Sequence, residues 1–401
     1  MKQVHINMNV KKPLLLFSVT VIVLLGLAIL LQYLVNREVI VGLPSEQGHA
    51  HAHGEDEQGN QQEGESPQDG QTDLEISPGV NLISNYGFEV GTREQIWGWA
   101  RIGQEQGVVV YRDDDISRRG LASAAVDTNG ASVIDAGLIM RLDELPRARD
   151  VIFEGYIKTD DLAGEAYLKI LAEGKAEGDE KIRPVVIAST DEVNGDSDWT
   201  PTRIRCYVPP ETTGVWLEAG VYGKGRAWFD DLSLSVEERE DALASGENLL
   251  RNPTFEEGTR HWHLFSETIN PVLEYGAIPM GPHGGMALYL QDRTPDPSVV
   301  KYSGFHQAIC GLYGHKGTLA VSGWLRADNA GGNGYVGVGV FKAGGEQLLR
   351  NPVQVSGNLP WSDFSMSIPI DGEVASVWVM INLEGSGRLY VSDLKATFQE
   401  Q

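Results

Sequence analysis

The sequence predicts an all-β protein in which two tandem antiparallel β-sandwich domains follow one N-terminal transmembrane helix and an acidic linker. Three observations predict this organisation. Short apolar runs alternate with Gly, Pro, Asn and Asp over most of the chain, which is typical of strands and turns. One long uncharged apolar segment lies near the N-terminus. The remainder contains the same sequence pattern twice, which indicates two copies of one domain.

The composition excludes several classes of protein. The 401 residues include 56 acidic and 32 basic side chains, a formal charge of −24. Such a chain lacks the excess of Lys and Arg with which proteins bind nucleic acid, so we expect no nucleic-acid partner. Cys206 and Cys310 are the only cysteines, which excludes a disulfide scaffold and a cysteine-rich zinc module. We expect two buried, unpaired thiols.

The first element is the apolar segment 13–36, which contains no charged residue and is long enough for the ~20 residues that a membrane-spanning helix needs. Lys2, Lys11 and Lys12 precede it, so the positive-inside rule places residues 1–12 in the cytoplasm and the rest outside. A cleaved signal peptide is the alternative, but its apolar region is shorter and ends in small residues. The sequence therefore predicts a single-pass membrane protein with extracytoplasmic domains.

The second element, residues 37–78, is a His-containing stretch rich in Gly, Gln, Ser, Pro and acidic residues. It has too few apolar side chains to offset the entropy cost of ordering, so it predicts a disordered, self-repelling linker.

The third and fourth elements are the two copies of the repeated pattern. Their opening, middle and closing motifs recur in the same order, which predicts domains at 79–238 and 248–399 joined by a linker at 239–247. The matching segments are 81–93 with 248–260, 155–160 with 323–328, and 228–232 with 390–394.

Within the first copy, short apolar runs predict strands at 151–159, 166–172, 202–208, 214–221 and 226–236. Alternation of large and small residues recurs in the second copy, and no stretch after the apolar segment has a helical period. Many short strands at this spacing favour a two-sheet antiparallel sandwich, with the jelly roll as its expected form.

The opening motif NLISNYGFE and the closing motif AWFDDLSL resemble those of carbohydrate-binding modules of families 4, 9 and 22. The second copy matches through 248–262, 321–327 and 389–394, so the resemblance covers about 80–398. It implies a galactose-binding-like jelly roll in each copy and a non-catalytic module that binds glycan. It does not specify which glycan.

The resemblance also implies a structural calcium where the first and last strands meet. In the first copy this corner brings Glu89 towards Asp230 and Asp231, whose oxygens suit Ca²⁺. The second copy keeps Glu256 and Asp393 but has Ser in place of the first aspartate, so we expect its site to be weaker or absent. The alternative is a set of solvated turn carboxylates.

Three aromatic pairs recur at strand edges and are expected to fill the cores. They are Phe88 with Phe255, Trp97 with Trp262, and Trp199 with Trp361.

Other aromatic residues share a strand face with charged residues, as Trp216 does with Glu218 opposite the apolar set 215, 217 and 219. An aromatic ring beside charged or amide groups suits a sugar, whose C–H groups pack on the ring while its hydroxyls form hydrogen bonds. The alternative is that these faces point into a wide sandwich. The candidate glycan platform is Tyr156, Tyr167, Trp216 and Glu218 in the first copy and Trp324, Arg326, Tyr335 and Trp378 in the second.

These observations predict a membrane-anchored protein that binds a polysaccharide or other glycan at the cell surface through two modules. Two alternatives remain: a structural or adhesion subunit that contacts another envelope protein, and an enzyme acting on glycosidic bonds. The chain has no nucleophile elbow, zinc-protease motif, P-loop or dinucleotide-binding motif, which disfavours an enzyme.

Overall fold

The computed structural model describes residues 79–142, 147–174, 183–239, 246–266, 273–293, 302–342 and 347–401. The predicted cytoplasmic segment, membrane span and linker (1–78) lie outside the described residues. Within the described ranges no helix is long and apolar enough to cross a membrane. The single helical element there is one turn of 3₁₀ helix, η1 (Gln104–Gln106), so this part of the chain is all-β as predicted.

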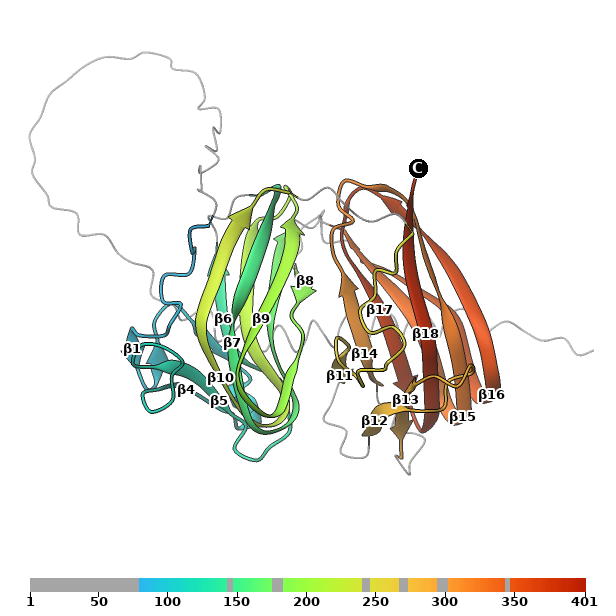
Figure 1. Ribbon diagram of the computed structural model, residues 1–401, viewed down its shortest axis with the longest axis horizontal. Helices are drawn as coiled ribbons and strands as arrows, with labels where there is room; N and C mark the ends of the chain where they lie inside the picture. The colour runs from blue at the N-terminus through green and yellow to red at the C-terminus, as the bar shows by residue number, and fades with distance from the viewer. Residues whose placement is uncertain are drawn as a thin grey trace, which may run out of the picture. The chain divides into compact units, whose positions relative to one another are not determined.

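The first half of the described chain forms one antiparallel sandwich (Figure 1). Its strands are β1 (Gly91–Thr92), β2 (Gln95–Ile96), β3 (Ala100–Ile102), β4 (Val109–Asp113), β5 (Ser123–Asp127), β6 (Val133–Leu142), β7 (Arg149–Gly174), β8 (Arg183–Ser189), β9 (Val193–Val208) and β10 (Gly214–Glu237).

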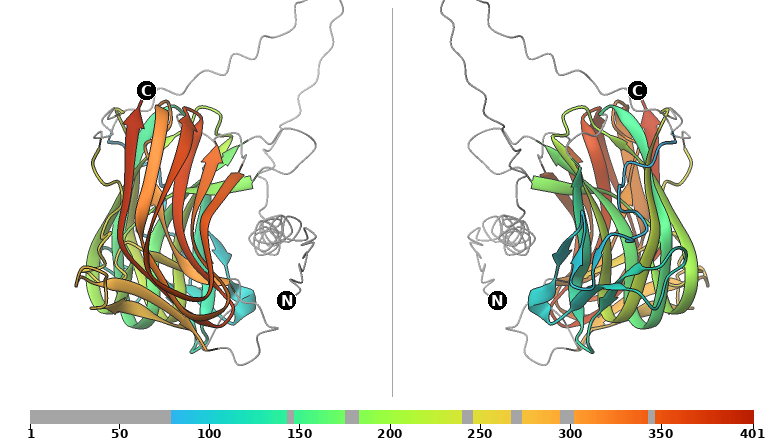
Figure 2. Two further views of the ribbon diagram at one scale, coloured as in Figure 1. Left: turned by 90° about the vertical axis from the view of Figure 1, so that its right-hand side faces the viewer. Right: turned by 90° about the vertical axis from the view of Figure 1, so that its left-hand side faces the viewer.

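The second half forms another antiparallel sandwich, whose long strands run side by side in Figure 2. Its strands are β11 (His263–Ser266), β12 (Leu273–Ile278), β13 (Ala287–Asp292), β14 (Tyr302–Ile309), β15 (Lys316–Lys342), β16 (Gln347–Asp371), β17 (Val374–Glu384) and β18 (Gly387–Glu400).

The longest strands pass through both layers of their sandwich. In the first sandwich, the N-terminal half of β10 pairs with β6, and its C-terminal half pairs with β5. Strand β7 pairs with β10 along both halves, with β9 mainly along its first half and with β8 along its second. One layer is therefore β4-β5-β10-β7-β9 and the other is β3-β6-β10-β7-β8. All five predicted strand ranges lie within β7, β9 and β10.

Backbone geometry shows where these strands bend. Gly225 has φ +139°, and a Cβ atom at this position would lie 2.4 Å from the Asp161 carbonyl oxygen. Gly387 in the second sandwich has φ +121°, and its Cβ would lie 2.4 Å from the Asn329 carbonyl oxygen. Only glycine avoids that contact, so both bends depend on glycine.

Each sandwich has its own hydrophobic core, and the aromatic pairs within them partly correct the sequence prediction. Phe255 and Trp262 are fully buried with ring centroids 5.4 Å apart. The partner of Phe88 is Trp99, at 5.7 Å, whereas the predicted partner Trp97 is 61% exposed. The first copy has extra residues before this tryptophan, so the alignment of the two copies selected the wrong one.

The third predicted core pair is also wrong. Trp199 and Trp361 are half-buried, and neither belongs to a core cluster. Each lies on a strand at one edge of its outer layer (β9 or β16), where a large ring covers the sheet margin without entering the sandwich.

One asparagine near the start of each sandwich joins its first segment to its last strand. The Asn81 side chain donates to the Leu232 carbonyl (3.0 Å) and accepts from the Ile83 and Leu234 amides (3.0 Å each). Asn248 repeats this arrangement around Leu394. The opening and closing motifs therefore recur together because they are hydrogen-bonded to each other.

The two sandwiches belong to one compact unit, Ile76–Gln401. Both cores are built wholly from residues within that unit. A compact unit that contains its own hydrophobic cores is expected to fold alone.

Replacing Asn81 or Asn248 with Ala is expected to destabilise the corresponding sandwich by about 1–3 kcal/mol, because backbone groups lose their partner. Thermal unfolding of each variant measures the loss. Asn194→Ala is the matched control, because its side chain is exposed. Equal melting temperatures for all three variants would contradict this role.

Candidate functional site

The structure divides the predicted glycan platform between two different layers. Tyr167, Trp216 and Glu218 lie on β7 and β10 in the layer that contains β6 and β8. Tyr335 and Trp378 lie on the matching layer of the second sandwich. The other three residues lie on the opposite layers, so the eight do not form one kind of surface.

The predicted facing of β10 is confirmed. Val215, Leu217 and Ala219 belong to the first core, while Trp216 and Glu218 do not. Trp216 and Glu218 nevertheless have only 7% and 6% of their surface exposed. They face away from the core of their own sandwich and are covered from the other side.

A charged cluster lies beside Glu218 on this face. The Lys169 ammonium is 2.8 Å from Asp135 and 3.7 Å from Glu218. The Tyr167 hydroxyl donates a hydrogen bond to Asp135, and its ring lies 3.8 Å from the Lys169 nitrogen. Sequence analysis missed Asp135, which comes from β6 and is brought here by strand pairing alone.

The pKa values of the two carboxyls in this cluster are shifted in opposite directions. Burial alone would raise the pKa of Asp135, but Lys169 and Tyr167 outweigh it and lower that pKa. For Glu218, burial outweighs Lys169 and raises the pKa to about 7. Burial alone would lower the pKa of Lys169, but its two carboxyl neighbours raise it. The ion pair is therefore Lys169 with Asp135, and Glu218 is the group that takes up a proton.

The second sandwich presents an aromatic face at the matching position. The rings of His306 and Trp378 are stacked with centroids 4.5 Å apart, and Phe341 lies 4.8 Å from Trp378. Tyr335 is buried at 4% exposure and Trp378 is half-buried. Burial, together with nearby His263, lowers the pKa of His306 well below its ordinary value, so this ring is neutral.

These two faces meet along a surface that we call the seam, formed by β7 and β8 of the first sandwich with β11, β14 and β17 of the second. The Trp378 indole donates to the Val186 carbonyl at 3.2 Å. The Glu165 carboxylate accepts from the Leu264 amide at 3.0 Å and lies 3.3 Å from the His263 ring. Two residues of the predicted platform, Tyr167 and Trp378, therefore have neighbours from the other sandwich, and the His263 ring lies 6.3 Å from that of Tyr167.

Charged pairs continue the seam at its rim. Asp191 is paired with both Arg251 and His261, and the Glu192 carboxylate accepts from the His261 amide at 3.0 Å. Burial, reinforced by Glu165, raises the pKa of Glu192 to about 7.

The two thiols also lie near the seam. Cys206 is buried and Cys310 half-buried, and both are free, as predicted. The Cys310 thiol donates to the Ile187 carbonyl at 3.1 Å. Burial raises the pKa of each thiol, that of Cys310 to about 11, which keeps both protonated and unreactive.

Several buried polar atoms on the two faces have no hydrogen-bond partner within the described residues. They are Trp216 Nε1 in the first sandwich and His306 Nδ1 and Asn382 Oδ1 in the second. Each costs about 1–3 kcal/mol when it is removed from water without a partner. The two faces therefore cover each other without supplying hydrogen-bond partners for these buried polar atoms.

The remaining predicted platform residues lie elsewhere. Tyr156 is half-buried under the Arg118 guanidinium, which lies 3.3 Å from its ring centre. Trp324 is half-buried with the His283 ring 5.1 Å away, edge-on. Arg326 forms a bidentate pair with Asp328 at 2.9 and 3.1 Å. These side chains already have partners in the fold.

The predicted calcium residues of the first copy are brought together at one corner. Asp230 is fully buried and accepts from the amides of Arg118, Arg119 and Asp231. Burial raises its pKa to about 6. Asp231 pairs with the Arg118 side chain, and Glu89 accepts from the Leu121 amide at 3.0 Å.

Amides and a guanidinium therefore bind the carboxylate oxygens that the resemblance assigned to calcium, and an ion there would compete with the Arg118 side chain for Asp231. In the second copy Glu256 is exposed and Asp393 half-buried, and Ser392 donates to the Met286 carbonyl instead. Across the described residues, no three carboxylate, imidazole or thiol groups come together in a way that could hold a metal. Calcium binding stays a prediction.

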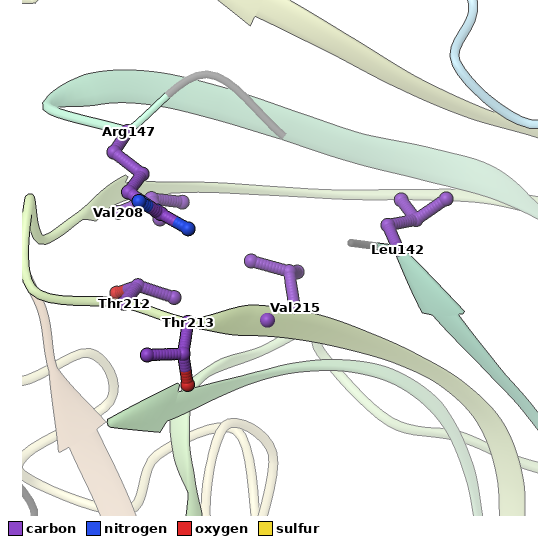
Figure 3. A pocket seen from close by; sticks show the side chains of 7 residues that line it. Leu142, Arg147, Val208, Thr212, Thr213 and Val215 are labelled. Carbon is purple, nitrogen blue, oxygen red and sulfur yellow. The ribbon is translucent and has the colours of Figure 1, made fainter. Parts of the chain in front are cut away.

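A small hollow opens at one end of the first sandwich, with an empty volume of about 160 Å³ (Figure 3). Leu142, Val208, Thr212 and Val215 line it, and Arg147 extends beside Val208. The hollow is open to solvent and encloses no space for even a water molecule, and no predicted site residue lines it. The hollow is not a glycan site.

The pH dependence of stability follows from Glu218. Its folded pKa of about 7 lies above the ordinary value of 4.5, so the folded state binds the proton more tightly than the unfolded state. The contribution of Glu218 to the free energy of unfolding is therefore greatest below pH 4.5. It falls by roughly 1–3 kcal/mol as the pH rises through 7. Chemical denaturation between pH 5 and pH 8 measures the free energy of unfolding. This free energy should decline less with pH for Glu218→Gln than for the exposed control Glu105→Gln.

Calcium binding at the first corner would require the ion to displace Arg118 from Asp231. Arg118→Ala is therefore expected to enlarge any rise in melting temperature that calcium produces over a chelator. A rise that is identical with and without Arg118 would show that calcium binds elsewhere.

No family model matches the chain, and no curated protein matches its sequence significantly. Three solved structures illustrate what it is similar to. The tandem CBM22-1–CBM22-2 domain of Paenibacillus barcinonensis Xyn10C is 16% identical over 81% of this chain and 99% of its own, with a TM-score of 0.33.

The C-terminal family 22 carbohydrate-binding module of Clostridium thermocellum Xyn10B is 14% identical over 38% of this chain and 95% of its own, with a TM-score of 0.29. A family 4 carbohydrate-binding module is 18% identical over 37% of this chain and 99% of its own, with a TM-score of 0.28. Two of these structures are single carbohydrate-binding modules and one is a tandem of two.

Proposed function

We propose that this protein binds a polysaccharide or other glycan, without cleaving it, through the two faces that meet at the seam. The predicted span at 13–36 would anchor it in the membrane and hold both sandwiches outside the cell. The acidic composition gives the sandwiches no affinity for nucleic acid.

The observation that carries the proposal is the set of outward-facing aromatic residues with unused polar atoms beside them. Trp216 and Trp378 occupy matching strands of the two sandwiches, and both rings turn away from the core of their own sandwich. The unpartnered atoms of Trp216, His306 and Asn382 lie on the same faces, and Glu218 beside Trp216 is 3.7 Å from the Lys169 ammonium. Rings to pack on pyranose C–H groups and polar atoms to bond hydroxyls are what a sugar requires.

Binding at these faces requires the seam to open, because Tyr167 is 2% exposed with the His263 ring of the other sandwich 6.3 Å away. The affinity for glycan is then reduced by the fraction of molecules that are open. The unpartnered polar atoms lower the cost of opening, since water or sugar hydroxyls satisfy them once the faces separate. Two faces on one chain also gain avidity for a polymer.

Hydrolysis is less well supported than binding. Glu218 and Glu192 have the raised pKa values that a general acid needs, but both lie at the closed seam. The small hollow near Val215 is lined by neither of them. No pair of carboxyls faces an open ligand-sized cleft among the residues that the structure describes.

The burial of Trp216 favours a second candidate function, in which the seam is permanent and the two sandwiches form a rigid spacer or adhesion subunit. Stacking of Tyr207 on Tyr313, with ring centroids 5.1 Å apart, and the pairs formed by Asp191 would then serve to fix the two sandwiches relative to each other. Its partner would be another envelope protein.

Two variants with opposite expected effects separate these functions. Asp191→Ala breaks rim pairs without altering either face, so it should populate the open state and increase retention on polysaccharide several-fold. Trp216→Ala/Trp378→Ala removes both rings and should reduce retention about tenfold or more. The measurement is co-sedimentation of Ile76–Gln401 with a panel of insoluble glycans, after thermal melting has verified each fold.

Trp199→Ala is the matched control, because that ring is half-buried on the opposite layer. No retention of the wild type or of Asp191→Ala on any glycan would reject the proposal and favour the rigid subunit. Retention that the double variant keeps would move the site away from the seam.

A further inference from the structure

Exposed apolar side chains are concentrated in the loops of the first sandwich. Val90 is 54% exposed, Trp97 61%, Tyr86 49% and Leu121 76%. We call these four residues the apolar patch. We propose that the apolar patch docks on the interfacial region of a lipid bilayer, independently of the seam and of glycan binding.

The patch is held together by the fold. The buried Asn85 side chain donates to the carbonyls of Val90 (2.9 Å) and Trp97 (2.8 Å) and accepts from the Val90 amide. The Trp97 amide in turn donates to the Val90 carbonyl at 3.2 Å. Leu121 is linked to the same loop, because its amide binds the Glu89 carboxylate. The exposed rings therefore project from a fixed platform.

The second sandwich provides an internal comparison. Asn252 repeats the role of Asn85, donating to the Gly258 and Arg260 carbonyls and accepting from the Glu257 amide. Glu257 thus stands in the place of Val90, and Arg260 in that of Trp97. These two side chains form an exposed ion pair at 2.9 Å.

The same loop scaffold therefore folds with charged residues at these positions, so its architecture does not require apolar ones. Exposed apolar residues that the fold does not need, on loops joined by hydrogen bonds, indicate a contact surface. Val90 and Trp97 are apolar whereas their counterparts Glu257 and Arg260 are charged, so the two copies do not share this function.

The chemistry of the patch favours lipid over sugar. Polar groups beside the rings are already engaged, since Glu89 binds the Leu121 amide and Arg112 binds the Phe88 carbonyl and Asp114. A sugar would find few partners for its hydroxyls. Trp and Tyr with aliphatic neighbours suit the boundary between lipid headgroups and acyl chains. The Arg119 side chain, two residues before Leu121, is 74% exposed and lies 3.8 Å from the Asp231 carboxylate.

The position of the patch in the chain favours a membrane over a protein partner. The described chain begins at Gly79, and the predicted span ends at Asn36. The predicted disordered linker, residues 37–78, would span roughly 35 Å or more. Together with the predicted membrane span it would hold the first sandwich close to the surface that the patch would contact, which would make weak docking effective. Figure 1 shows β1, next to the patch, on the side of the first sandwich away from β8 and the seam.

The test uses Ile76–Gln401, which lacks the predicted span, so that any vesicle binding comes from the sandwiches. Binding is measured by co-sedimentation with phosphatidylcholine vesicles, with and without phosphatidylglycerol. Val90→Glu/Trp97→Arg installs the pair found in the second sandwich and should weaken binding about tenfold or more. The reciprocal Glu257→Val/Arg260→Trp should strengthen it. Met280→Ala, at an exposed apolar residue of the second sandwich, is the matched control and should bind as the wild type does.

Failure of the wild type to sediment with either vesicle would overturn the proposal and leave a protein partner as the occupant of the patch. Equal binding by the wild type and Val90→Glu/Trp97→Arg, with both folded, would also overturn it. Because no glycan is present, neither outcome affects the proposal for the seam.

Discussion

The bend of the long strands from one layer of each sandwich into the other is the constraint on which the remaining structure depends. Strand β10 contributes one half to each layer, and the change of layer occurs where Gly225 avoids the Asp161 carbonyl. This bend places Trp216 and Trp228 of the same strand on opposite sides of the sandwich. The seam, the charged cluster and the carboxylate corner all occupy positions that the bends define.

The seam combines contacts that favour its closure with buried polar atoms that have no hydrogen-bond partner. Aromatic rings and a few hydrogen bonds across the seam favour closure, whereas several buried polar atoms are left without partners. Buried polar networks stabilise a protein interior only when every member is satisfied. A contact that is closed but incompletely satisfied is better suited to exchange with a ligand than to permanent assembly, which is why binding is the function proposed here.

Differences between the two copies separate features that the fold requires from features that belong to one copy. The hydrogen bonds of Asn81 and Asn248 are the same in both copies, because each asparagine joins the first segment of its sandwich to the last strand. In the loops that follow, Asn85 and Asn252 also form matching hydrogen bonds. The loop of the first copy exposes apolar side chains, whereas the loop of the second exposes an ion pair. Features common to both copies are therefore assigned to the fold, and features of one copy to a particular contact.

The sequence by itself determined the all-β class, the two-copy organisation and the strand positions, and the structure decided between the two facings of Trp216 that the sequence left open. The class, organisation and strand positions follow from local alternation and from motif repetition, which depend on neighbouring residues. Only the tertiary structure decided that Trp97 is exposed, that Asp135 joins Lys169, that the eight platform residues divide between layers and that two faces cover each other. The reason is physical: strand pairing across long sequence separations and packing between sandwiches leave no periodic signal in the chain, and burial depends on what covers a face as much as on which way it points.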